Sequence, residues 1–432
     1  MKRLFIEPLD VLMFRSERPF IARESHVAKF SEIIFPLTFE GAIKSKIFLE
    51  FCKRKDYLPS DFQRKKKRDR KRDETENDVK KSLEKLVNFV KEKISKDTEL
   101  PEILEVIGYP PAVVGYNINK LLEILETSPL NYPSKINVLG VFFSKKDKKE
   151  EYFPIPNDIV RKDDKNDEIL KLTPILKEEL KIPNTDNYAC FSIYSKIKEK
   201  KGLMSFSALK DYLWGGKPDK SQIIDNPYKT ELRTGIQLKR GTKTTVTGHL
   251  YTAEFLRLKD WKEHWEFVVW IEDEHGLLEK YLSKIENEII RLGGEGKGAI
   301  CTKIDEINLA DKLGFSDLIE KINEEKRFKL YLAAPSCFNG HEPPIEKLKE
   351  KLKVEKLWLR AALPGKPIYI GGYDFAMNVE KPLRRCVNAG AVYYYEFRGK
   401  IKRDSLLIKI IKENIDMRCA FIGRWSEDVR KG

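Results

Sequence analysis

Residues 230–258 form the segment that most constrains the fold. The run TELRTGIQLKRGTKTTVTGHLYTAEFLRL is rich in β-branched residues and is interrupted by Gly235, Gly241 and Gly248. Because β-branched residues favour strands and glycines mark breaks between them, this pattern predicts two strands over about 231–257. The hairpin that joins them is basic.

Apolar patterns on both sides of this hairpin predict a repeated order of elements. Residues 4–6, 266–271 and a stretch toward Ile307 predict strands. Two apolar stripes predict amphipathic helices: Phe39, Ile43, Ile47 and Phe51 after Pro36, and Leu278, Tyr281, Leu282, Ile285 and Ile289. The order strand–helix–strand–strand–helix–strand is that of a ferredoxin-like, RRM-type split βαβ unit.

The last part of the chain repeats this theme. Strands are predicted at 328–333, 357–361, 391–397 and 419–425, and helices at 345–352 and 405–414, the latter with Asp404 as its N-cap. We therefore expect an α+β protein with two ferredoxin-like domains, residues 1–307 and 308–432. The first carries a large, partly helical insertion at about 54–230.

This insertion contains a strongly basic run. Residues 64–73, RKKKRDRKRD, hold eight bases in ten residues, a pattern typical of a solvated loop or a disordered arm. Apolar spacing predicts one helix at 79–94 and more helix around 118–125, while 145–151 and 161–168 are expected to be loops. A contact between the basic run and RNA is the alternative to a mobile surface.

The overall charge indicates a polyanionic partner. Lys and Arg number 82 and Asp and Glu 68, which gives a net charge of +14. No apolar run is long enough to span a membrane, and Glu7 and Asp10 interrupt the start where a signal peptide would be apolar. We expect a cytoplasmic protein that does not contact membranes.

Cysteine and histidine spacings give no metal or cofactor site. The six cysteines are scattered without a CxxC pair, which argues against both a zinc ribbon and a disulfide framework. The five histidines show neither HxH nor HExxH spacing. The acidic run at 272–274 is best interpreted as a solvated turn, and Tyr393, Tyr394 and Tyr395 as core residues rather than a stacking surface for bases.

The glycine-rich segment RLGGEGKGAI is the sharpest local motif. A dinucleotide fingerprint needs a strand before the glycines and a helix after them, whereas here the predicted helix comes first. It is not a P-loop either, because Lys297 is followed by Gly298 rather than Ser or Thr. Four glycines beside a lysine still permit a close approach of the backbone to a phosphate chain, so we expect an RNA backbone contact.

Several segments together resemble one family. IEPLDVLMFRSERPF, ELRTGIQLKRGTKTTVTGHLYTAEF, LGGEGKG, GGYDFAMNVEKPLRRCVNAGAVYYYEF and FIGRW are similar to the third subunits of the Cmr complex, the type III-B CRISPR effector, in the RAMP superfamily. The chain departs from the family pattern at Tyr373, where tryptophan is common, and at Ala391, where Ser or Thr is common.

This resemblance implies a non-catalytic subunit without cofactors that anchors the 5′ tag of the CRISPR RNA. It also implies contacts with the large polymerase-like subunit and the backbone RAMP subunits, an indirect contact with target RNA, and a role in antiviral defence. The expected RNA-binding residues are Arg15, Arg18, His26, Lys44, Lys46, Arg233, Lys239, Arg240, Lys243, Gly293, Gly294, Gly296, Lys297 and Gly298.

Two other functions stay open. His26 lies among Arg15, Arg18, Arg23 and Lys29, and it could act as the general base of a metal-independent endoribonuclease that processes CRISPR RNA. A pure protein scaffold is the third alternative, and it predicts no retention of RNA at moderate salt.

Overall fold

The computed structural model describes most of the chain. The described residues are 1–14, 27–28, 34–65, 75–109, 134–163, 168–175, 189–191, 196–239, 241–259, 264–273, 277–338, 340–374, 379–403, 406–412 and 415–426. Four features considered in the sequence lie outside these residues: the basic run from residue 66, the predicted helix at 118–125, Trp261 and the predicted N-cap Asp404.

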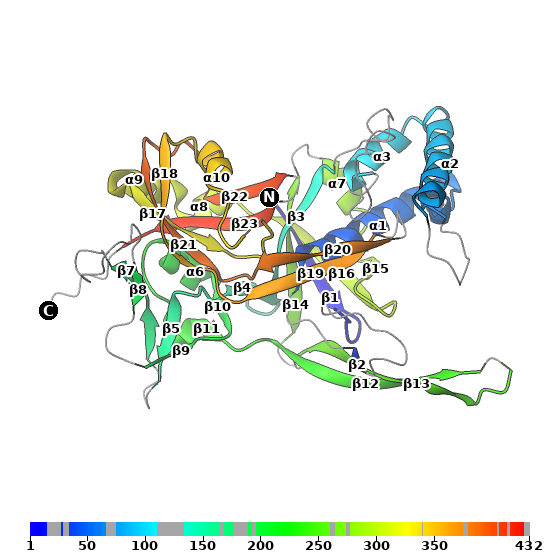
Figure 1. The fold of residues 1–432 in the computed structure, drawn as a ribbon, viewed down its shortest axis with the longest axis horizontal. Helices are drawn as coiled ribbons and strands as arrows, with labels where there is room; N and C mark the ends of the chain where they lie inside the picture. The colour runs from blue at the N-terminus through cyan, green and yellow to red at the C-terminus, as the bar shows by residue number, and fades with distance from the viewer. Residues whose placement is uncertain are drawn as a thin grey trace.

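An antiparallel sheet of eight strands forms the first half of the fold (Figure 1). Its order is β11 (Ile223–Ile224), β10 (Leu203–Ser205), β4 (Glu150–Pro154), β3 (Ile136–Lys145), β14 (Trp265–Asp273), β1 (Lys2–Pro8), β16 (Gly298–Glu306) and β15 (Ile289–Arg291). Four of these strands, β3, β4, β10 and β11, come from residues 54–230. The predicted insertion is therefore too wide, because part of it builds the sheet.

One face of this sheet is covered by helices. They are α1 (Pro36–Lys55), α2 (Glu76–Ile94), α3 (Leu100–Ile107) and α7 (Leu277–Leu282). The predicted stripe Phe39, Ile43, Ile47 and Phe51 is buried against the sheet, which confirms the first amphipathic helix. Each such side chain contributes about 1.5–3 kcal/mol when fully buried.

The second predicted amphipathic helix is shorter than expected. It ends at Leu282, and Asn287 adopts a left-handed conformation with φ 62°. Ile289 then belongs to β15, where Ile290 is buried while its two neighbours are exposed, a period of two rather than 3.6. Residues 292–298, which we call the glycine loop, therefore join two antiparallel strands and do not follow a helix.

A five-stranded antiparallel sheet forms the second half. Its order is β18 (Lys356–Leu363), β21 (Val392–Arg398), β17 (Arg327–Leu332), β23 (Ile415–Arg424) and β22 (Leu407–Lys412). The predicted strands are confirmed, as is the helix α10 (Ile345–Leu352), and all three tyrosines of β21 are fully buried.

The predicted helix at 405–414 is wrong, because residues 407–412 form β22. Ile408 and Ile410 are buried, whereas Ile411 is exposed and Lys409 is only partly covered. This alternation matches a strand, and β-branched isoleucines favour one.

Two further hairpins are described below, and several other described elements also lie outside the two large sheets. They are α6 (Phe206–Leu213), α8 (Leu309–Leu313), α9 (Phe315–Glu325), the 3₁₀ helices η1 (Pro59–Phe62) and η2 (Lys220–Gln222), the sheet β6 (Ile169–Lys171), β5 (Ile159–Lys162), β9 (Ile197–Glu199), and the pair β7 (Thr173–Ile175), β8 (Ala189–Phe191).

The two halves share one apolar core. The second face of the eight-stranded sheet and α6 pack against the five-stranded sheet, with Trp270 and Phe421 in edge-to-face contact at 6.2 Å between ring centroids. The Tyr331 hydroxyl of the second half donates to the Pro154 carbonyl of the first. These contacts make the halves one packed body.

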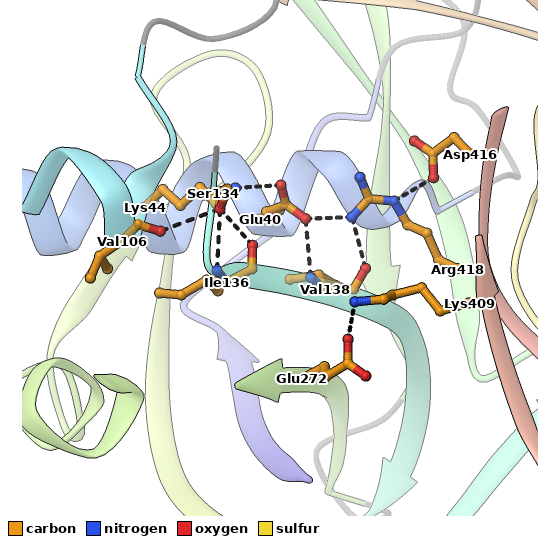
Figure 2. Close-up of polar contacts among 10 residues, drawn as sticks. All are labelled: Glu40, Lys44, Val106, Ser134, Ile136, Val138, Glu272, Lys409, Asp416 and Arg418. Carbon is orange, nitrogen blue, oxygen red and sulfur yellow. Dashed lines mark hydrogen bonds and ion pairs between the residues drawn. The ribbon is translucent and has the colours of Figure 1, made fainter. Parts of the chain in front are cut away.

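A buried charge network reinforces the junction (Figure 2). The Arg418 guanidinium on β23 pairs with Glu40 on α1 and with Asp416 at 2.6 Å, and it donates to the Val138 carbonyl of β3 at 3.0 Å. Glu40 also accepts from Lys44, at 2.6 Å. Burial alone would raise the pKa of Glu40, but the charges of Arg418 and Lys44 lower it to about 2.

Cys337 and Cys386 form a disulfide, which the scattered cysteine spacing did not predict. The two positions are 49 residues apart and meet next to the isolated bridge between Ser336 and Val387. Cys52, Cys301 and Cys419 are buried free thiols.

Candidate nucleic-acid interface

The predicted hairpin is confirmed as a long two-stranded ribbon that extends from the body of the molecule (Figure 1). Strands β12 (Tyr228–Leu238) and β13 (Thr245–Leu258) form it, and the short β2 (Val27–Ala28) runs parallel to β13. The ribbon belongs to a separate three-stranded sheet. It is thus an appendage of the first half and not part of the repeated strand order.

The tip of this hairpin presents free positive charge. Lys239 and Lys243 are exposed, and neither forms an ion pair with a residue that the structure describes. The tip is closed by hydrogen bonds from Lys239 N to Thr244 O and from Lys243 N to Lys239 O, both 2.9 Å. Arg240 lies outside the described residues.

One face of β12 is apolar and exposed. Leu232, Ile236 and Leu238 keep 65%, 49% and 47% of their surface accessible. Leu232 and Ile236 lie on the same side of the strand with Thr234 between them, and Leu238 follows a register shift toward the tip. The hairpin thus combines cations at its tip with an aliphatic face along its length.

The base of the hairpin is held by four charged residues. Asp10 lies 2.9 Å from both Arg233 and Arg257, and Glu231 pairs with the same two arginines, with Arg233 at 2.8 Å. Hydrogen bonds from Arg257 and Arg233 lower the pKa of Glu231 to about 2. The predicted contact residue Arg233 therefore anchors the hairpin base and already has acidic partners.

The glycine loop lies beside this base and contacts the segment that follows β1. Gly293, at φ 76°, has no room for a side chain, because an added Cβ would overlap the Met13 carbonyl oxygen. That oxygen accepts from Gly294 N at 2.8 Å. Gly296, at φ 64°, has open space around it. Gly293 therefore serves packing, whereas Gly296 leaves a bare stretch of backbone at the surface.

Phe255 links the glycine loop to the hairpin base. The Lys297 ammonium lies 5.0 Å from the centroid of the Phe255 ring, and the Arg233 guanidinium lies 5.5 Å from it. Phe255 itself is buried with Val11, Met13 and Ala253. The glycine loop and the hairpin base thus meet at one aromatic ring, where the Lys297 ammonium adds a positive charge to the paired residues of the base.

The predicted residues Arg15, Arg18 and His26 lie outside the described residues, but the ends of their segment are placed. Leu12 forms a bridge with Leu256, and Val27 pairs with Thr252. Both of these described contacts are made with β13.

The two predicted lysines of α1 lie elsewhere. The Lys44 ammonium is in the buried network with Glu40, and Lys46 pairs with Glu50 and Glu288, both at 2.9 Å. Their side chains are only 14% and 8% exposed. The structure does not bring them to the hairpin or the glycine loop.

Asp10, Arg257 and Phe255 were not among the predicted site residues. Strand alternation could have indicated part of this cluster, because Phe255 and Arg257 lie on the same side of β13. Pairing with Asp10 depends on the course of the chain after β1, which no spacing shows.

Clusters of metal-binding side chains and long apolar helices would indicate two other kinds of site in the described part of the chain. No three His, Cys, Asp or Glu side chains gather there in a way that could hold a metal ion. No described helix is long and apolar enough to cross a membrane.

Comparisons with known proteins place the chain in a family. The model of a family described as CRISPR-associated protein (Cas_Cmr3) matches residues 4–409. No curated protein matches the chain.

Solved structures show weaker similarity. A chain in the cryo-EM structure of the type III-B Cmr-beta bound to cognate target RNA and AMPPnP is 15% identical, with a TM-score of 0.41 over 91% of this chain and 86% of that chain. A chain in the crystal structure of the Csm3–Csm4 subcomplex of the type III-A interference complex is 12% identical, with a TM-score of 0.35 over 98% and 99%. TM-scores this low carry no weight for function.

Proposed function

This chain belongs to the CRISPR-associated Cas_Cmr3 family, and from that premise we propose that it is a non-catalytic RNA-binding subunit of a type III-B CRISPR ribonucleoprotein. In this role it holds the 5′ tag of the CRISPR RNA and bridges the large polymerase-like subunit to the backbone subunits. The observation that carries the proposal is the projecting hairpin β12–β13, whose exposed lysines have no described acidic partner.

The hairpin supplies affinity through phosphate contacts. Each ammonium at the tip neutralises a phosphate and releases a counterion, so binding weakens as salt rises. The aliphatic face of β12 offers contact to bases or sugars, and the backbone at Gly296 is open to close approach. Selectivity for the tag requires base-edge contacts to unpaired nucleotides.

We also infer that each half contains a ferredoxin-like unit. In the first half, the strands β16-β1-β14-β3 have the order fourth, first, third, second of such a unit, and β23-β17-β21-β18 repeat this order in the second half. This assignment replaces the predicted one, because β3 and not the hairpin supplies the second strand of the first unit.

The test removes the two tip charges. Lys239→Ala combined with Lys243→Ala should weaken binding of tag-containing single-stranded RNA by about 1–2 kcal/mol, or roughly 5- to 30-fold. The slope of log affinity against log salt should fall by about 1.4, as expected for two phosphates on a single strand. The measurement is RNA affinity at several salt concentrations, with a pull-down of the large subunit.

A matched control is available in the second half. Lys353 and Lys356 are also exposed, and Lys353 shares the left-handed conformation of Lys243, with φ 56° against 53°. Changing both to Ala should leave RNA affinity unchanged. Equal losses from both variants would show that only net charge matters, and a loss of pull-down alone would make the hairpin a protein interface.

The same preparation separates the alternative functions. Metal-free cleavage of repeat-containing RNA by the isolated chain, abolished by His26→Ala, would establish the endoribonuclease. Absence of RNA binding by the wild-type chain at moderate salt would establish the protein scaffold.

A further inference from the structure

A second, shorter hairpin lies in the C-terminal half. Strands β19 (Pro367–Asp374) and β20 (Val379–Val387) form a two-stranded sheet outside the five-stranded one. In the view of Figure 1 it overlaps α1. An isolated two-stranded ribbon is marginally stable in water, so its order depends on what covers its faces.

The inner face of this hairpin is anchored. Ile368 packs with the Cys337–Cys386 disulfide, and Phe35, directly before α1, and Ile370 pack against the same cluster. Ser336 and Val387 exchange two backbone hydrogen bonds of 2.9 and 2.8 Å at its base. These contacts hold the ribbon rigidly by one side.

The outer face carries an aromatic ring beside an arginine. Tyr369 is 46% exposed, and its cross-strand partner Arg385 is also exposed. Leu383 is 55% exposed on the same side, in contact with the position that a side chain on Gly371 would take. Gly371 and Gly372 are exposed and leave the ribbon bare next to these side chains.

The charge of this region favours an anionic ligand. Arg385 has no ion pair with any described residue, and Lys366 is exposed nearby. Lys381 on β20 is a further positive charge of this region, and its repulsion is one of the smaller causes that lower the pKa of Lys44, after burial and against the opposing effect of Glu40.

We propose that the outer face of β19–β20 is a stacking surface for unpaired bases of RNA, with Tyr369 against a base and Arg385 on a phosphate. An exposed aromatic ring, a free guanidinium and a side-chain-free backbone suit a base with its flat face on the ribbon and its phosphate at the edge. The proposal rests on the proposed function only in taking RNA as the ligand, since it uses a surface separate from β12–β13.

The test compares three variants of the full chain in binding to a short single-stranded RNA. Tyr369→Ala should lower affinity about tenfold, the loss expected for one stacked base, whereas Tyr369→Phe keeps the ring and should stay within twofold of wild type. Trp358→Ala is the control: Trp358 is 40% exposed beside Arg360, but Glu396 neutralises that arginine at 2.9 Å. It should leave affinity unchanged.

The outcomes separate this inference from the proposed function. Unchanged affinity in Tyr369→Ala, or an equal loss in Trp358→Ala, overturns the stacking surface. If the Lys239/Lys243 variant still loses affinity in that case, the proposed function stands alone. Loss of a neighbouring protein subunit from the complex, with RNA affinity intact, would overturn the inference in favour of a protein contact, and no RNA binding by the wild-type chain overturns both.

Discussion

The two halves of the molecule have the same five-strand order but use it differently. In the first, β3-β14-β1-β16-β15 lie side by side, and in the second, β18-β21-β17-β23-β22 repeat that order. In both, the last two strands form a hairpin at the sheet edge. The β15–β16 hairpin carries the glycine loop beside the candidate nucleic-acid interface, whereas β22–β23 carries Lys409, Asp416 and Arg418 toward the first half.

This difference shows how one arrangement of strands serves two purposes. The outer strand of an edge hairpin has a neighbouring strand on one side only. Its loop and outward-facing side chains are therefore not constrained by pairing with another strand. In the first half that freedom exposes backbone at Gly296. In the second half, the edge hairpin carries Lys409 and Arg418, which form ion pairs with residues of the first half.

The largest expected effect comes from breaking the junction. Arg418→Ala leaves the buried Glu40 without its main opposite charge, so the free energy of unfolding should fall by about 3–5 kcal/mol. The measurement is denaturation in urea. Arg424→Ala on the same strand removes a more exposed pair with Glu325 and should cost about 1 kcal/mol. Equal losses of unfolding free energy in Arg418→Ala and Arg424→Ala would show that the buried network stabilises the protein no more than an exposed ion pair does.

Next comes the glycine loop of the first half. Gly293→Ala forces a side chain toward the Met13 carbonyl in a left-handed conformation, and stability should fall by about 2–4 kcal/mol. Gly296→Ala meets open space and should cost about 1 kcal/mol.

RNA affinity is a second measurement that distinguishes the roles of Gly293 and Gly296. Gly296→Val should weaken guide-RNA binding while the protein stays folded. Unchanged RNA retention would remove the loop from the interface, and similar unfolding energies for Gly293→Ala and Gly296→Ala would contradict the packing role of Gly293.

The two sheets should contribute to the pH dependence of stability in opposite directions, because each contains a buried ionisable side chain of a different type. Burial raises the pKa of Glu266 on β14 to about 7, so its contribution is complete below about 4.5 and is lost as pH rises to 7. In the second sheet, burial keeps the pKa of Lys329 well below its usual value, so its unfavourable contribution is relieved as pH rises toward 10.5. Lys329 Nζ has no hydrogen-bond partner among the described residues.

The expected results have opposite signs. The free energy of unfolding of the wild type should fall by up to about 3 kcal/mol between pH 4.5 and 7 because of Glu266. In Glu266→Gln this fall should be absent. Lys329→Met should stabilise the protein at pH 7 by about 1–3 kcal/mol, with a gain that shrinks toward pH 10.5. Urea unfolding across pH measures both, and parallel profiles for variant and wild type would contradict either assignment.

The smallest effect is expected at the outer ion pair of the junction. Lys409 on β22 pairs with Glu272 on β14, and the two side chains are 16% and 35% exposed. Lys409→Met should cost less than about 1 kcal/mol because solvent screens the pair. A loss as large as that of Arg418→Ala would mean that the two pairs act as one network.

Local patterns were sufficient where one face of an element is buried. The stripe Phe39 to Phe51 has the helical period, and residues 230–258 have strand composition with glycine breaks, so both elements were predicted. The family resemblance rested on short motifs that occur along the chain, and the match over residues 4–409 supports the family.

Pairing between strands decided which segments are strands where the local apolar pattern did not. Residues 407–412 form β22 and Ile289 belongs to β15 because each segment pairs with the next strand in a hairpin at a sheet edge. The backbone hydrogen bonds of that pairing outweigh the weak helical preference of the local sequence. The same holds for β3, which residues 54–230 supply to the centre of the first sheet.

By itself, the sequence determined the class of elements, the basic hairpin and the surplus of positive charge, because these depend on neighbouring residues and on composition. Only the tertiary structure decided that Arg418 meets Glu40, that Cys337 meets Cys386, and that Phe255 lies between Lys297 and Arg233. Those contacts join residues far apart in the chain. Their distances depend on how the two sheets pack, which residue spacing does not encode.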